Sequence, residues 1–81
     1  MDEKRKKHRQ RVFKSATIEF HGGAIDCIVK NISAAGAALE VTSPLGIPER
    51  FDLVIPAEHF RRPCRLAWRK ATRIGVEFDE D

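Results

Sequence analysis

Hydrophobic and polar residues alternate with a period of two along much of the chain, which is the pattern of strands that bury one face. The apolar positions of the first two runs are Ala16, Ile18, Phe20, Ile25, Cys27 and Val29. The segment His21-Gly22-Gly23 separates these runs, and glycine adopts the positive φ of a tight turn without steric cost. The two runs therefore predict a β-hairpin.

Four more strands are expected in the rest of the chain. They fall at residues 37–41, 51–55, 64–69 and 74–78, separated by segments rich in Gly, Pro, Asn and Ser. A single turn of helix is expected at 57–60. Six short strands without a long helix predict an all-β domain, either a barrel or a sandwich. A closed barrel has the advantage that it leaves no exposed sheet edge.

The charge of the chain is distributed unevenly. Residues 1–14 carry seven of the fifteen Lys and Arg side chains against two acidic ones, a local net charge of +5. Residues 15–81 carry eight basic and ten acidic side chains, a net charge of −2. The sequence thus predicts a basic arm at 1–14 and a folded domain at 15–81. Such an arm attracts anions, which include nucleic acid, anionic lipid and phosphorylated small molecules.

Several classes of protein are not favoured by the sequence. No apolar run approaches the roughly 18 residues of a membrane span, and the charged first 14 residues do not resemble a signal peptide. We therefore expect a cytoplasmic location without membrane insertion. Cys27 and Cys64 lie outside any CxxC pattern and are expected to be buried, reduced thiols. No catalytic triad, metal motif or Walker loop is recognisable, so we expect a non-enzymatic protein without a bound metal.

Trp68 is the only tryptophan of the chain. It alternates in phase with Cys64 and Leu66. This phase favours a place in the core for the indole over a place at a ligand surface.

Two short motifs carry candidate chemistry. Arg5 and Arg9 have RxxxR spacing, and arginine binds phosphate through planar, bidentate hydrogen bonds and stacks on flat rings. The segment 31–36 places Asn31, Ser33 and Gly36 in a turn, where side-chain donors and acceptors lie beside backbone amides. Taken separately, the first motif could also belong to a generic basic tail, and the second could also be an ordinary turn between strands.

In this order the motifs resemble the PilZ domain family, in which RxxxR precedes a strand and a [D/N]xSxxG turn. The segments 66–69 and 73–78 are similar to the last two strands of that family, so the resemblance covers nearly the whole chain. It implies a small six-stranded antiparallel β-barrel, of the split-barrel type, with a flexible N-terminal arm. It also implies a receptor for cyclic di-GMP whose arm becomes ordered when the ligand binds.

The resemblance also implies which residues bind the ligand, with no further cofactor. They are Arg5, Arg9, Arg11, Asn31, Ser33 and Gly36. The family pattern admits Lys7 and Arg11 as an alternative to the pair Arg5 and Arg9, which is preferred because lysine cannot make a bidentate fork. Asn31 stands where aspartate is more usual, and loses the charged acceptor for a guanine edge.

Two alternatives remain open at this level. The first is a small β-barrel that binds nucleic acid through its basic arm. The chain has only five Phe and one Trp, and its net-acidic body offers little to bases or phosphates, which disfavours this alternative. The second is a PilZ-like adaptor that does not bind cyclic di-GMP. For a PilZ-like protein, whether or not it binds cyclic di-GMP, we expect a downstream protein partner of unknown identity to receive the signal.

Overall fold

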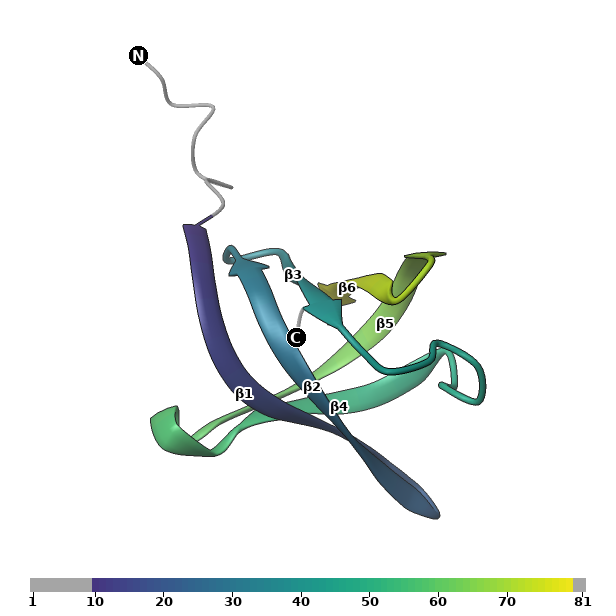
Figure 1. Ribbon diagram of the computed structural model, residues 1–81. Coiled ribbons are helices and arrows are strands. Elements are labelled where there is room, and N and C mark those ends of the chain that lie inside the picture. The colour runs from purple at the N-terminus through teal and green to yellow at the C-terminus, as the bar shows by residue number, and fades with distance from the viewer. Residues whose placement is uncertain (1–9, 80–81) are drawn as a thin grey trace.

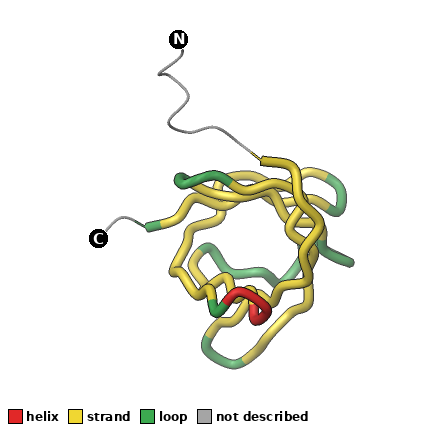
Figure 2. Tube along the Cα trace, turned by 90° about the vertical axis from the view of Figure 1, so that its left-hand side faces the viewer, coloured by secondary structure: helices red, strands yellow, loops and turns green. Residues whose placement is uncertain are grey.

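The computed structural model describes residues 10–79, which form one closed antiparallel β-barrel (Figures 1 and 2). Its strands are β1 (Gln10–Phe20), β2 (Gly23–Ile32), β3 (Gly36–Glu40), β4 (Arg50–Ile55), β5 (Phe60–Lys70) and β6 (Arg73–Phe78). The short 3-10 turn η2 (Pro56–Glu58) joins β4 to β5. The predicted six-stranded all-β barrel is confirmed. The order around the ring is β1-β2-β3-β6-β5-β4.

The core lies inside the ring and is built from alternate residues of every strand. The largest fully buried side chains are Ile18, Val29, Leu39, Leu53, Ile55, Cys64 and Ile74. Burial of one such aliphatic side chain contributes about 1.5–3 kcal/mol. The inward set fixes the register of each strand, because a slip by one residue would turn the whole set outward.

The first strand begins at Gln10, inside the segment that the sequence assigned to the arm. Val12 packs against the core, and Arg11 pairs with Asn31 on β2. Residues 10–14 therefore extend β1. The alternation is hard to read here because the outward positions Arg11 and Phe13 include a large apolar residue.

Trp68 lies outside the core, so the prediction that it is a core residue is wrong. Its side chain is 46% exposed. A register shift between Leu66 and Trp68 inserts one extra residue into β5, which changes the face that the following side chains occupy. Trp68 is therefore paired with Gly75 on the outer side of the barrel.

Cys27 and Cys64 are buried and unbonded, in agreement with the expectation of buried thiols. Burial raises the pKa of each thiol to about 12, from an ordinary value of 9.0. A thiol that is neutral in the folded state is inert toward alkylation. None of the helices in residues 10–79 is long and apolar enough to cross a membrane.

The buried thiols predict a loss of stability at alkaline pH. The unfolded thiols ionise above about pH 9 while the folded ones stay protonated up to about pH 12. Stability from this source is complete below pH 9 and falls by at most about 1.4 kcal/mol per thiol per pH unit above it. Urea unfolding at pH 8 and pH 10 should show the fall. A Cys27→Val, Cys64→Val double variant should show a smaller one, and an equal fall in both would contradict this assignment.

Shortening a core side chain should lower the stability of so small a domain strongly. Leu53 is fully buried, so Leu53→Ala is expected to lower the free energy of unfolding by about 2–5 kcal/mol. Leu45→Ala is the control, because the Leu45 side chain is 78% exposed and should cost less than about 0.5 kcal/mol. Urea unfolding followed by circular dichroism measures both. Equal losses would show that the barrel interior is not the principal source of stability.

Candidate ligand-binding face

Strand register aligns five residues in one row across the outer surface of the barrel. The row runs through Arg11 on β1, Asn31 on β2, Ala38 on β3, Gly75 on β6 and Trp68 on β5, each paired with the next. Directly paired residues of antiparallel strands point to the same side of a sheet. The flanking residues of β3 and β6 are buried in the core, so the row points outward. We call these five residues the outer row.

The middle of the outer row consists of the small, buried residues Ala38 and Gly75, and the indole of Trp68 lies over Gly75. A Cβ atom added to Gly75 would sit 2.1 Å from Nε1 of Trp68. Only glycine therefore leaves room for the ring at this place. The indole is half exposed, so one of its surfaces is available to solvent. Together these features make an aromatic platform backed by the sheet.

The other end of the outer row brings two of the sequence-predicted residues together. Arg11 is exposed and lies directly opposite the half-buried Asn31. The start of β1, the end of β2 and the β2–β3 turn lie side by side in the ribbon (Figure 1). Arg5 and Arg9, and the alternative residue Lys7, lie outside the described residues.

Ser33 shapes the β2–β3 turn from within. Its Oγ accepts hydrogen bonds from the backbone N–H groups of Ala35, at 3.1 Å, and Gly36, at 3.3 Å. Its own N–H donates to the carbonyl oxygen of Gly36 at 2.8 Å. A hydroxyl that accepts hydrogen bonds from two backbone N–H groups holds the turn in one conformation. It thereby also fixes the position of Asn31 near the end of β2.

Gly36 is required by the contact between two strands. An added Cβ would lie 2.1 Å from the backbone carbonyl oxygen of Val76 on β6. The φ of Gly36 is not positive, so this position does not need the conformational freedom of glycine in a turn. The close approach of β3 to β6 explains the glycine instead. Ser33 and Gly36 thus both have local structural roles beside any role toward a ligand.

An exposed aromatic ring next to Arg11 was not singled out by the sequence analysis. The Phe13 side chain is 75% exposed, and Nζ of Lys30 lies 5.0 Å from the centroid of its ring. The two residues come from β1 and β2 and lie between the pair Arg11–Asn31 and the next pair, Lys14–Val29. The signal in the sequence is a phenylalanine within a polar stretch, which is weak evidence by itself because single exposed hydrophobic residues are common.

The charges beside the outer row are largely paired within the barrel. Glu77 pairs with Arg65, and Arg73 pairs with Glu40 at 3.1 Å. A hydrogen bond from Thr72 and a second from Arg73 lower the pKa of Glu40. Glu40 and Glu77 are therefore each matched by a cation of the barrel.

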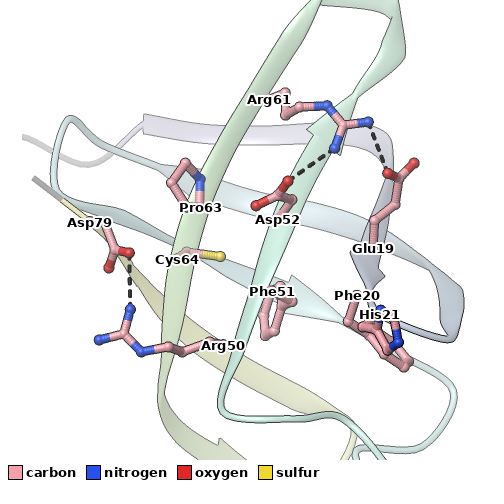
Figure 3. A pocket seen from close by; sticks show the side chains of 10 residues that line it. All are labelled: Glu19, Phe20, His21, Arg50, Phe51, Asp52, Arg61, Pro63, Cys64 and Asp79. Carbon is pink, nitrogen blue, oxygen red and sulfur yellow. Dashed lines mark hydrogen bonds and ion pairs between the residues drawn. The ribbon is translucent and has the colours of Figure 1, made fainter. Parts of the chain in front are cut away.

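A hollow in the described part of the chain lies over β1, β4 and β5 (Figure 3). It is an open depression of about 540 Å³. Arg61 donates to Glu19 at 2.8 Å and to Asp52 at 3.0 Å, and hydrogen bonding to these carboxylates, Glu19 first, raises the pKa of Arg61. Arg50 pairs with Asp79 at 3.1 Å. Three carboxylates against two guanidinium groups do not suit an anionic ligand.

The hollow and the outer row share strands β1 and β5 but use different positions on them. The hollow is lined by Glu19 of β1 and Arg61 of β5, among others, whereas the row uses Arg11 and Trp68 of the same strands. Because the hollow does not suit an anionic ligand, the row is the better candidate for binding an anion. In the part of the chain that the structure describes, no group of three His, Cys, Asp or Glu side chains could hold a metal ion.

Comparison with known proteins agrees with this architecture. The family model described as PilZ domain matches residues 3–81, which is nearly the whole chain. The protein belongs to the PilZ domain family, and the resemblance noted in the sequence is confirmed. No curated protein matches the chain.

The contact between Gly75 and Trp68 gives a direct test of the outer row. Gly75→Ala introduces a Cβ within 2.1 Å of the indole nitrogen, so the ring must leave its place. Trp68 is the only tryptophan and the chain has no tyrosine, so its fluorescence reports this movement alone. We expect emission to shift to longer wavelength while the far-ultraviolet circular dichroism is retained.

The matched control for that test is Gly46→Ala. A Cβ at Gly46 would meet no atom within 4 Å, although its positive φ makes the substitution somewhat strained. Its emission should equal that of the wild type. An unchanged spectrum in Gly75→Ala would contradict the placement of the indole over β6.

Proposed function

We propose that this protein is a receptor module for cyclic di-GMP that binds its ligand on the outer row. The observation that carries the proposal is the row by which strand register connects Arg11 and Asn31 with Trp68 through β1, β2, β3, β6 and β5. A cyclic dinucleotide has phosphates and purine bases. A guanidinium group, an amide and an indole are suited to a phosphate, a base edge and a base face, respectively.

The basic arm supplies further phosphate ligands in this proposal. Residues 1–9 join β1 directly ahead of Arg11, so the arm enters the site at the end of the outer row that carries Asn31. Arg5 and Arg9 form the preferred clasp, with Lys7 and Arg11 as the alternative pair. Binding would fix the arm against the barrel, and this ordering would be the signal that a downstream protein reads.

Ser33 and Gly36 contribute indirectly in the same proposal. The Ser33 hydroxyl holds the β2–β3 turn, and Gly36 lets β3 approach β6. Both arrangements keep Asn31 and the small residues of the row in one surface. Nothing in the proposed site supplies a nucleophile and general base, so the proposed activity is binding and signalling.

Titration of the wild type with cyclic di-GMP, by calorimetry and by Trp68 fluorescence, tests the proposal. We expect saturable binding that GTP and cyclic GMP do not reproduce. Arg9→Ala should weaken it by about ten- to a hundredfold, since a charge-assisted hydrogen bond contributes about 1.5–3 kcal/mol. Comparison of the affinities of Arg11→Ala and Lys7→Ala with that of Arg5→Ala shows which pair, Arg5 and Arg9 or Lys7 and Arg11, binds the phosphates.

Two outcomes would contradict the proposal in different ways. Binding by Arg9→Ala that is as tight as that of the wild type would remove Arg9 from the site. No binding by a folded wild-type protein would favour the adaptor alternative. Gel shifts with RNA and DNA at two salt concentrations address the nucleic-acid alternative, which predicts steep salt dependence.

A further inference from the structure

We propose that Phe13 is a second base-stacking platform of the binding face and that Lys30 is its positioning residue. This inference rests on the proposed function, because it assigns a contact for the second purine of the same ligand. Asn31 and Trp68 can engage one base of a cyclic dinucleotide. Phe13 lies on β1, two residues after Arg11, whereas Trp68 lies on β5 at the other end of the outer row.

The exposure of Phe13 is the first observation. The described residues have three exposed large hydrophobic side chains, which are Phe13, Leu45 and Trp68. Phe13 is the only one of the three in β1, on the same outward side as Arg11 and Ser15. Alternate residues of a strand are about 7 Å apart, so the ring stands within the reach of a ligand held by Arg11.

Two strand irregularities at this place are the second observation. The β1–β2 register shifts between Arg11 and Lys14, and the β2–β3 register shifts between Val29 and Asn31. Bulges reorient side chains and interrupt pairing, and they are over-represented next to binding and catalytic sites. Here they bring Phe13 and Lys30 together beside Asn31, which regular strands would not do.

The contact between Lys30 and Phe13 is the third observation. The Lys30 ammonium group lies 5.0 Å from the ring centroid, at cation–π distance. It occupies one side of the ring, and the 75% exposure of Phe13 leaves the rest to solvent. A purine can stack on this open surface, because every base presents a flat π-face. The cation also holds the ring in one orientation, which lowers the entropic cost of stacking.

Calorimetric titration of variants with cyclic di-GMP tests this assignment. Phe13→Ala should weaken binding by about five- to a hundredfold, the range for loss of one base–aromatic stack. Phe13→Tyr should bind nearly as the wild type does. Lys30→Gln should weaken binding less than Phe13→Ala, and Lys30→Arg should restore it, because arginine also makes cation–π contacts. Leu45→Ala, at an equally exposed position on the β3–β4 connection, should bind normally.

A spectroscopic readout separates stacking from a merely structural role. A Trp68→Phe chain keeps an aromatic ring at residue 68, and calorimetry first establishes that this chain still binds cyclic di-GMP. In that chain, Phe13→Trp puts the only indole at the proposed platform, and Leu45→Trp puts it at the control position. Addition of cyclic di-GMP should quench the first and leave the second unchanged. Binding by Phe13→Ala within twofold of the wild type would overturn the inference while the proposed function stands. No binding by the wild type would overturn both.

Discussion

Closure of the barrel through β1 is the constraint on which the rest of the structure depends. β1 pairs with β2 on one side and with β4 on the other, and thereby closes the sheet β1-β2-β3-β6-β5-β4 into a ring. A domain of 81 residues has a small core, and an open sheet would leave unpaired backbone groups at two edges. Closure removes both edges and fixes each register at once. The outer row follows from the backbone pairing of β1 with β2, β2 with β3, β3 with β6, and β6 with β5.

The same closure explains where the barrel departs from regular pairing. A ring of six strands must bend sharply, and bulges supply local bend and twist. One bulge places Trp68 on the outer surface, and the two others place Phe13 and Lys30 beside Asn31. Gly36 and Gly75 supply the room that this geometry needs. The bulges in the strands thus supply the binding face with its aromatic side chains, Phe13 and Trp68, and with the cationic side chain of Lys30.

The contrast between Ile74 and Trp68 shows what the sequence could predict. Ile74 and its neighbours alternate within a regular strand, so period-two reasoning locates the strand and its buried face correctly. Trp68 follows a bulge, and an extra residue changes the parity of every later side chain. Alternation alone carries no mark of that insertion, so the indole was assigned to the core.

The candidate site was predictable to a similar degree. The spacing of Asn31, Ser33 and Gly36 located the turn, because these residue types have local reasons to occur there. The bonds by which Ser33 holds the turn and the clash that excludes a side chain at Gly36 depend on β3 and β6 coming together. That is a property of the closed ring, which the spacing of the motif does not encode. Phe13 was missed because its significance comes from Lys30, a partner on another strand.

The distribution of charge completes the physical case for the outer row as an anion site. Acidic groups near the row could compete with a phosphate for the basic arm. Glu40 and Glu77 are the acidic side chains of β3 and β6, and each is matched by a cation of the barrel, Arg73 and Arg65 respectively. The carboxylates of the hollow pair with Arg50 and Arg61. Glu40 and Glu77 are thus matched within the barrel and do not compete with a phosphate for Arg11, whereas Lys14 is itself paired with Glu58.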